Sequence, residues 1–296
     1  MIELRPCESD ADLEAWRQVR IAVVPYERTD SIEELRRAAT PERLLLLAFR
    51  DGALAGSGVG GRSDTAGGFA IPRVLVEHRR HGVGTALLRA LAEHVGALGF
   101  PDLGVGVDDD GSLEFARSFG FEEVGRQVEQ VRAVGAGEPW PGIPDGIAVV
   151  SLAERPELLA RLYHELALDA FEDMPTPRKV EITPEQWESE WVTWPEATFA
   201  ALAGGDVVGM AGLAHDGDRP ERAENVLTTV RRDFRGRGIA RALKETTIAW
   251  ASDRGLREIY TWTQTGNENM QAVNEKLGYV TRTVSISLRR PLPLPA

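Results

Sequence analysis

The sequence predicts an α/β protein built from two tandem copies of one domain. An apolar run typical of a strand, a basic turn with glycine and an amphipathic helix occur in that order around Arg79, and again around Arg235. These two arginines lie 156 residues apart (235 − 79), about half of the 296-residue chain. A repeat of this length indicates a duplicated domain rather than a short solenoid unit. Each copy has room for a core of its own.

Turn and capping signals place the elements of the first copy. Ser9 is an expected helix cap, Ser31 opens a capping box with Glu34, and Asp51-Gly52 is typical of a hairpin turn. The expected order is a strand at 2–5, helices at 9–23 and from 31, hairpin strands at 44–49 and 54–58, a strand ending at 76, the helix after the basic turn, a strand at 103–107, a short helix from 112, and strands after 121 that complete the copy.

A Pro/Gly-rich stretch without periodicity, 135–146, separates the copies and is the predicted linker. We therefore predict domains at 1–134 and 147–296. Thr183 opens another capping box, with Pro184 at the first helical position. The second copy is expected to have a strand at 147–151, helices at 156–171 and 184–194, hairpin strands at 198–203 and 207–213, a strand at 223–230, the helix after its turn, a strand at 258–263, an Asn-rich helix, and closing strands to 288.

Each basic turn is a predicted anion site. A turn that opens directly into a helix leaves the first helical N–H groups unpaired, and the helix dipole adds positive potential at the same place. Gly82 and Gly238 allow positive φ and a close approach of the backbone to a ligand. The following helices carry apolar stripes that pack on a sheet, with Val83, Leu87, Leu91 and Val95 in the first copy and Ile239, Leu243, Thr247 and Trp250 in the second.

Both turns resemble the Arg/Gln-x-x-Gly-x-Gly/Ala motif of the GCN5-related N-acetyltransferase (GNAT) family. A second motif of that family, an Asn-containing helix ending in Leu-Gly-Phe/Tyr, resembles the segment from Asn267 to Tyr279. The first copy has a similar segment from Ser112 to Phe121, with Gly120 and Gly278 158 residues apart (278 − 120). The resemblance implies two GNAT domains, each a mostly antiparallel central sheet flanked by helices.

The same resemblance implies that acetyl-CoA is the co-substrate and that the turns hold its pyrophosphate. Carried over residue by residue, the cofactor-binding positions in the second copy are Thr228, Thr229, Val230, Arg235, Gly236, Arg237, Gly238, Ile239, Ala240, Arg241 and Asn267. In the first copy they are Val74, Val76, Arg79, Arg80, His81, Gly82, Val83 and Gly84. Asn267 has an alternative role as the cap of its helix, which is common for Asn at such a start.

Direct acetyl transfer needs an oxyanion donor and a base for the acceptor. The family uses a backbone N–H of the strand before the turn as donor, which here lies within Thr228–Val230. Glu224, eleven residues before Arg235, is the expected base, because histone-type members carry their catalytic glutamate there; a solvated glutamate in a charged turn is the alternative. The first copy has Gly68 at the base position and Pro72, which lacks an N–H, in its donor segment.

The usual general acid of the family is missing. Many members have Tyr five residues before the final aromatic residue of the second motif, where this chain has Asn274 in the second copy and Ala116 in the first. Asn274 is expected to hydrogen-bond the sulfur or the pantetheine arm. Water, Thr263 or Thr265 would then protonate the thiolate, or the thiolate leaves unprotonated, as a thiol pKa of about 8.5 permits.

The family places acceptor contacts in its first two helices, where Trp187, Trp191 and Trp194 follow helical spacing. They form either an aromatic wall for the acceptor or, more commonly for such a stripe, part of the core. Asp173 lies between these helices and is either a ligand for a cationic acceptor or a solvated loop residue. Trp187, Trp191 and Asp173 are the expected substrate-binding residues.

Composition limits the other classes of function. The net charge of −12 argues against a general nucleic-acid binder, and no apolar stretch approaches the length of a membrane span. One Cys and five scattered His argue against a metal site and fit a cytoplasmic protein. Gly56-Ser-Gly58-Val-Gly-Gly61 matches a dinucleotide-binding fingerprint, but no helix is expected after it, and we interpret it as a tight turn in the sheet.

The sequence therefore predicts an acetyl-CoA-dependent N-acetyltransferase with a working second copy and a catalytically silent first copy. The acceptor is a small-molecule or peptide amine, and neither its identity nor the oligomeric state follows from the sequence. The alternative is a non-catalytic CoA-binding sensor or scaffold. The absent Tyr favours the alternative, whereas Glu224 and the intact second turn favour the enzyme.

Overall fold

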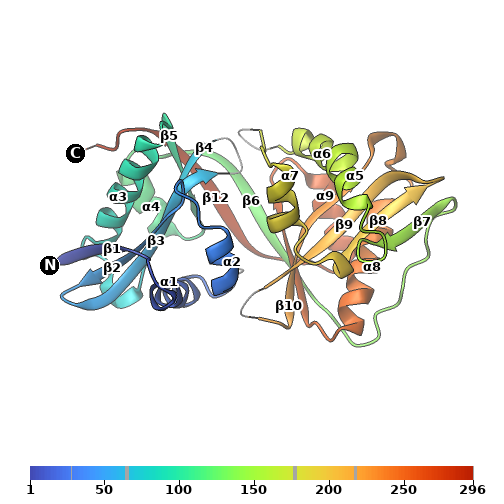
Figure 1. Ribbon diagram of the computed structural model, residues 1–296, viewed down its shortest axis with the longest axis horizontal. Helices are drawn as coiled ribbons and strands as arrows, with labels where there is room; N and C mark the ends of the chain where they lie inside the picture. The colour runs from blue at the N-terminus through green and yellow to red at the C-terminus, as the bar shows by residue number, and fades with distance from the viewer. Residues whose placement is uncertain (28, 64–66, 176–178, 217–218, 296) are drawn as a thin grey trace. The chain divides into compact units, whose positions relative to one another are not determined.

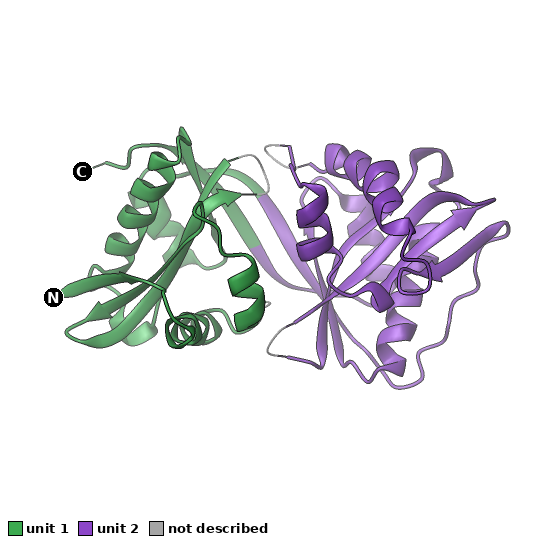
Figure 2. Ribbon diagram, viewed as in Figure 1, with its two compact units in different colours: residues 1–125, 285–296 green, residues 126–284 purple. Residues whose placement is uncertain are grey.

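The structure is a computed structural model, and it describes residues 1–27, 29–63, 67–175, 179–216 and 219–295. The chain forms two compact units (Figures 1 and 2). Unit 1 consists of residues 1–125 and 285–296, and unit 2 of residues 126–284. Each unit has a mixed, mostly antiparallel sheet flanked by helices, which confirms the predicted fold class.

Unit 1 has the strand order β1-β2-β3-β4-β5-β12, in which only β4 and β5 pair in parallel. Side chains alternate along β2: Leu45 and Leu47 pack in the cluster with Trp16 of α1, and Leu46 in the cluster with Leu87 of α3. The elements are β1 (Ile2–Pro6), α1 (Asp10–Val23), α2 (Ile32–Arg37), β2 (Leu44–Arg50), β3 (Ala53–Ser63), β4 (Gly67–Val74), η1 (Val76–His78), α3 (Val83–Ala97), β5 (Asp102–Val107) and α4 (Asp110–Ser118).

Unit 2 has the strand order β6-β11-β10-β9-β8-β7, in which only β10 and β11 pair in parallel. Phe199 packs in the cluster with Leu243 of α8, and its neighbour Ala200 in the cluster with Leu162 of α5. The elements are β6 (Glu122–Ala133), β7 (Ile147–Ser151), α5 (Leu158–Leu162), η2 (Tyr163–Ala167), α6 (Leu168–Asp173), α7 (Pro184–Gln186), η3 (Trp187–Trp191), η4 (Pro195–Ala197), β8 (Thr198–Ala203), β9 (Asp206–His215), β10 (Arg222–Val230), η5 (Arg232–Phe234), α8 (Ile239–Asp253), β11 (Glu258–Gln264), α9 (Glu268–Lys276) and β12 (Val280–Pro291), whose last residues belong to unit 1.

The two halves of the sequence exchange their last strands. β6 ends the first copy in sequence but pairs with β11 in unit 2, from Glu258↔Ala133 to Gln264↔Gln127. β12 ends the second copy but pairs with β5 in unit 1, from Ile286↔Val107 to Pro291↔Asp102. The strands after Phe121 and the strand to Leu288 were each expected to complete their own copy, and this expectation is wrong. The structural units therefore differ from the sequence domains 1–134 and 147–296, since local patterns do not encode which sheet a strand joins.

The glycine-rich run 56–61 lies inside β3 and is not the tight turn that we expected. A Cβ at Gly56 would lie 2.4 Å from the Arg73 carbonyl oxygen, and one at Gly58 would lie 3.0 Å from a Leu91 methyl. The missing side chains thus let the backbone of β4 at Gly56 and helix α3 at Gly58 approach this strand directly. Both glycine hairpins are confirmed, with Asp51 (φ 53°) and Gly52 (φ 84°) in one and Gly204 and Gly205 in the other.

Two predicted helices of the second copy differ in detail. The helix expected at 156–171 is continuous as α5, η2 and α6 and contains a π-helical turn. The capping box at Thr183 is confirmed, but the helix that it opens ends at Trp191 rather than at 194. Pro195 explains the early end, because it disfavours a helical conformation at the residue before it.

The strand exchange predicts that a substitution near the C-terminus destabilises the N-terminal unit. Leu288 is buried in the cluster formed by α3 and β5, so Leu288→Ala should cost unit 1 about 2–5 kcal/mol of unfolding free energy. Hydrogen exchange should show lost protection in α3 and β5. Exposed Val284→Ala is the matched control, and lost protection confined to α8 instead would contradict the assignment.

Candidate active site

The two basic turns share an unusual backbone. In the first copy Arg80 (φ 64°) and Gly82 (φ 84°) are left-handed, and in the second copy Gly236 (φ 76°) and Gly238 (φ 80°) are left-handed. Alternation between left-handed and ordinary residues turns successive N–H groups toward one point and forms an anion-binding concavity. Arg80 adopts this conformation without being glycine, which is uncommon and indicates local strain at the turn.

Each turn delivers unpaired helical amides. The Ala86 amide donates to the Gly82 carbonyl at 3.0 Å, and the Ala242 amide donates to the Gly238 carbonyl at 3.0 Å. The amides that precede Ala86 and Ala242 in these helices therefore lie before the first helical bond, and neither N-cap glycine has a side chain to bond them. Together with the helix dipole, these amides fit a phosphate group.

The turn arginines brace the turn. Arg79 Nε donates to the Val74 carbonyl at 3.2 Å, and Arg235 Nε donates to the Val230 carbonyl at 3.0 Å. The same bond, five residues back, therefore ties each turn to the strand before it. This repeated contact explains the need for arginine at this position independently of any ligand.

The other predicted cofactor residues divide into backbone and side-chain candidates. Val83 and Ile239 are buried, so their side chains belong to the core and only their amides face the turn. Val76 is 69% exposed, and Arg241 forms an ion pair with Glu245 at 2.8 Å. His81 Nδ1 lies 2.7 Å from the Arg79 carbonyl oxygen, and Arg237 Nη2 donates to the Asp233 carbonyl at 3.0 Å.

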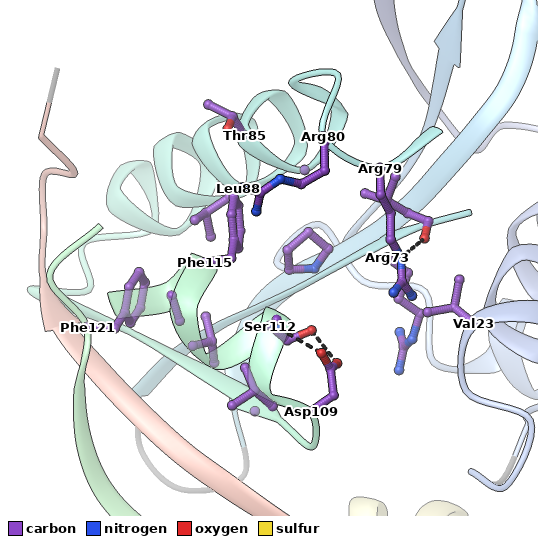
Figure 3. A pocket seen from close by; sticks show the side chains of 18 of the residues that line it. Val23, Arg73, Arg79, Arg80, Thr85, Leu88, Asp109, Ser112, Phe115 and Phe121 are labelled. Carbon is purple, nitrogen blue, oxygen red and sulfur yellow. Dashed lines mark hydrogen bonds between the residues drawn. The ribbon is translucent and has the colours of Figure 1, made fainter. Parts of the chain in front are cut away.

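A cavity of about 560 Å³ lies behind the first turn in unit 1 (Figure 3). Arg73 and Arg79 lie at one end, and Phe115 and Phe121 at the other. Asp109, which caps α4 through Ser112, borders its lower side. The lining also includes Val23, Pro72, Val74, Arg80, Gly82, Gly84, Thr85, Leu88, Val105, Gly106, Val107, Gly111, Ser112 and Ala116.

The cavity forms where two parallel strands separate. β4 and β5 pair at Gly68↔Leu103 and Phe69↔Gly104, and the cavity is lined by the later residues Pro72–Val74 and Val105–Val107. A ligand held by the turn can therefore extend an arm between the strands. At the expected donor position Pro72 has no N–H. The next residue, Arg73, is buried and forms an ion pair with Glu27 at 2.6 Å.

In unit 2 the parallel register runs from Arg222↔Glu258 to Glu224↔Tyr260 and ends there. Glu224 therefore lies at the point where β10 and β11 separate, and its side chain is half-buried. Directly after it, the register of β10 with β9 shifts between Asn225 and Leu227. Such a bulge re-aims the backbone of a strand and is frequent next to active sites. The register of β4 with β3 in the first copy has no such shift.

Sequence reasoning missed a buried polar cluster behind this bulge. Lys244 of α8 is 1% exposed, and its ammonium donates to Asn225 Oδ1, which also accepts from Thr228 Oγ1 at 3.1 Å. The ammonium lies 5.2 Å from the centre of the Tyr279 ring. Burial lowers the pKa of Lys244 to about 7. One signal was available: Lys244 falls at a core-facing position of an amphipathic helix.

Asn274 is buried in the same region. Its amide nitrogen donates to Gln130 Oε1 at 2.9 Å and lies 3.5 Å from Thr263 Oγ1. Among the described residues its Oδ1 has no hydrogen-bond partner. Asn267 lies at the N-cap of α9, but its side chain makes no capping bond. The capping alternative for Asn267 therefore lacks the bond that would define it.

Asp173 contacts the second turn. Its carboxylate accepts from Arg232 Nη2 at 2.5 Å and from Arg235 Nη2 at 2.7 Å. These two hydrogen bonds lower the pKa of Asp173 to about 2. The end of α6 is thus tied to the turn, and both carboxylate oxygens of this expected acceptor ligand are engaged.

The three tryptophans that were predicted to share one helix have different environments in the structure. Trp187 is 1% exposed, and its ring lies near Tyr163, Phe171 and Trp191, as the core alternative requires. Trp191 is only partly buried on the edge of this cluster. Trp194 lies outside the helix and stacks on His215, with ring centroids 3.5 Å apart.

Within the described residues no group of His, Cys, Asp and Glu has the arrangement of a metal site. Among the described helices, none combines the length and the apolar character that crossing a bilayer would need.

Replacement of Asp173 by Asn should lower the free energy of unfolding at neutral pH but not at strongly acidic pH. The folded-state pKa lies below the ordinary 3.8, so the stabilisation is present above about pH 4 and is lost as the pH falls toward 2. Because its arginine partners are half-exposed or more, we expect about 1 kcal/mol at neutral pH. Chemical denaturation of both proteins from pH 2 to 7 measures this difference, and an equal gap at every pH would refute the explanation.

Comparison with known proteins identifies the fold and the family. The model of the Acetyltransferase (GNAT) family matches residues 11–121 and 159–279. A mycothiol acetyltransferase of Geodermatophilus obscurus is 29% identical over 266 residues, covering 84% of this chain and 82% of the relative. One of Catenulispora acidiphila is 29% identical over 224 residues, covering 72% and 69%.

Two solved structures share the fold over nearly the whole chain. A tandem GNAT protein from the clavulanic acid biosynthesis pathway has a TM-score of 0.78 at 16% identity and covers 100% of both chains. A GCN5-related N-acetyltransferase from Sphaerobacter thermophilus has a TM-score of 0.75 at 20% identity, covering 98% of this chain and 95% of that one. Because the family model matches both halves, well over half of the sequence, this chain belongs to the GNAT acetyltransferase family, with two family domains in tandem.

Proposed function

We propose that the second copy transfers an acetyl group from acetyl-CoA directly to a primary amine of a small molecule or peptide. One observation carries this proposal: both copies have the anion-binding turn, but β10 of the second copy has a carboxylate, Glu224, at its last parallel pair, whereas β4 of the first copy has Phe69 there. Relatives named as acetyltransferases support acetyl as the transferred group.

The proposed chemistry assigns a role to each part of the site. The amides at Gly238–Arg241 hold the pyrophosphate, and the arm of the coenzyme extends between β10 and β11. Glu224 takes a proton from the acceptor, directly or through water. An amide of Thr228–Val230, displaced by the bulge, donates to the oxyanion of the tetrahedral intermediate. Asn274 borders the arm of the coenzyme, and Trp191 is the better placed of the predicted acceptor contacts because it is not fully buried.

We propose that the first copy binds CoA without catalysing transfer. Its turn and cavity have the features of a coenzyme site. However, Gly68 stands at the position of the base and Pro72 within the donor segment.

A non-catalytic CoA sensor is the second candidate, favoured by Asn274 at the usual Tyr position. Incubation with acetyl-CoA and a panel of amines, while thiol release is followed, separates the two candidates. Release that depends on an amine supports the enzyme, whereas binding without release on any acceptor supports the sensor.

Replacement of Glu224 by Gln should lower kcat about 100-fold or more, because the base is lost, and should leave the Kd for CoA nearly unchanged. Thiol release and calorimetry measure the two quantities. Glu221→Gln is the matched control, since this exposed carboxylate lies three residues earlier, just before β10 begins. Equal turnover of the Glu224 variant and the control at every pH would eliminate the assignment.

A matched pair of substitutions tests the two turns. Gly84→Asp and Ala240→Asp place a carboxylate at equivalent positions (240 − 84 = 156), where like charge opposes a diphosphate. Each should weaken CoA binding at its own turn at least about tenfold, or about 1.4 kcal/mol. Titration calorimetry should show one of about two sites lost in each variant, and amine-dependent thiol release should disappear only with Ala240→Asp. Loss of release with Gly84→Asp alone would reverse the assignment of the copies.

A further inference from the structure

The region around Lys244 differs from its counterpart in the first copy in one consistent way. The cavity of unit 1 has apolar residues at five lining positions whose sequence equivalents in unit 2 are all polar. Leu88, Val105, Val107, Ala116 and Phe121 in the first copy correspond to Lys244, Thr261, Thr263, Asn274 and Tyr279 in the second, at offsets of 156 or 158 residues. The second copy therefore has side chains that can form hydrogen bonds where the first copy has an apolar wall.

Local contacts place the Lys244 ammonium at the separation of the strands. It donates to Asn225, the residue that directly follows the last parallel pair, Glu224↔Tyr260. Asn225 is fixed in turn, because its amide nitrogen donates to the Gly212 carbonyl at 2.8 Å. Leu88, the equivalent of Lys244, is also 1% exposed and still lines the cavity of its unit. Deep burial of Lys244 is therefore compatible with contact to a ligand.

We propose that Lys244 donates a proton to the sulfur of CoA when the thioester breaks. This inference rests on the proposed function of the second copy and supplies the general acid that Asn274 cannot provide. The acceptor nitrogen bonds to the carbonyl carbon and gives its proton to Glu224. The C–S bond then breaks, its electron pair remains on sulfur, and sulfur takes a proton from the ammonium. Exchange with water afterwards returns a proton to Lys244 and removes one from Glu224.

The surroundings of Lys244 suit a donor that works near neutral pH. Burial is the cause of its lowered pKa of about 7, which lies below the roughly 8.5 of a thiol, so proton transfer from the ammonium to a thiolate is favourable. From β10, Asn225 and Thr228 form the neutral environment of the ammonium. The ammonium also faces the ring of Tyr279, in the segment after α9. Burial raises the pKa of the Tyr279 hydroxyl, and the charge of Arg132 acts in the opposite direction. Glu224 precedes Asn225 and points to the other face of β10 by strand alternation.

The lysine content makes a direct test possible. The chain has only Lys179, Lys244 and Lys276, and the first and last are exposed. Lysine labelled with ¹³C at Cε should therefore give three resolved resonances in the full-length protein. Lys179→Arg and Lys276→Arg assign the signal of Lys244 by elimination, without a change in the buried site. We expect that signal to titrate near pH 7 in the free protein, whereas the other two titrate near 10.

The decisive comparison uses CoA and desulfo-CoA, which lacks the sulfur. If the ammonium contacts sulfur, CoA should shift the Lys244 titration by at least about one pH unit relative to desulfo-CoA. Equal titrations with both bound ligands would overturn the proposal while leaving coenzyme binding intact. Failure of both ligands to bind would instead overturn the proposed function and the proposal together.

A kinetic test provides a second readout. Lys244→Met removes the proton, and Lys244→Leu introduces the residue that the first copy already accommodates. Both should lower kcat about 100-fold with less than a threefold change in KM for acetyl-CoA. The wild-type rate should fall as the pH rises above about 7, and this fall should be absent in the variants. Wild-type-like kcat and pH profiles in both folded variants would contradict the proposal.

Discussion

The candidate site depends on the separation of two parallel strands inside an otherwise antiparallel sheet. In unit 2 the backbone pairing of β10 with β11 runs from Arg222 to Glu224, and just beyond it the Asn225 carbonyl accepts from the Thr261 hydroxyl at 2.9 Å rather than from a backbone amide. An opening between strands leaves backbone donors available at its mouth, which a continuous ladder would consume. The glycine turn stands at the end of the same strand, five residues from Val230 to Arg235 along the chain. β10 and the turn after it thus carry, in order, the proposed base, the proposed oxyanion donor and the proposed phosphate-binding turn.

Duplication makes the chemical difference between the copies easy to identify. Both copies retain the turn, the arginine bond to the preceding strand and the helix with a glycine N-cap, so these features alone do not distinguish a catalytic copy from a silent one. The copies differ at the strand separation, where Gly68, Pro72 and Leu88 of the first copy correspond in sequence to Glu224, Thr228 and Lys244 of the second. Each difference in the first copy removes a charge, a donor or a proton. This pattern is the physical argument for catalysis in one copy only.

Sequence patterns predicted the turns and the fold well, because both depend on local chemistry. Glycine at positive φ and apolar spacing in α3 and α8 are visible in neighbouring residues. The exchange of β6 and β12 was not predictable, because a strand's alternation identifies its buried face but not its partner. The run at Gly56 to Gly61 was misinterpreted as a turn for a related reason. Its glycines are required by the close approach of segments distant in sequence, namely Leu91 of α3 at Gly58 and the backbone at Arg73 and Glu42 at Gly56 and Gly61.

The buried position of Lys244 was not predicted, although the free energy needed to bury an ammonium makes this residue informative. Burial of an ammonium costs free energy unless it is paired or deprotonated, and among the described residues the contacts of the Lys244 ammonium are the neutral amide of Asn225 and the ring of Tyr279. Leu88 shows that a leucine satisfies the same place in the fold. The fold therefore does not require a lysine at this place, and the free energy needed to desolvate an ammonium sets a preference against one. A lysine retained against that preference is best explained by the proton that it carries, and its environment holds that proton loosely enough to be given to a thiolate.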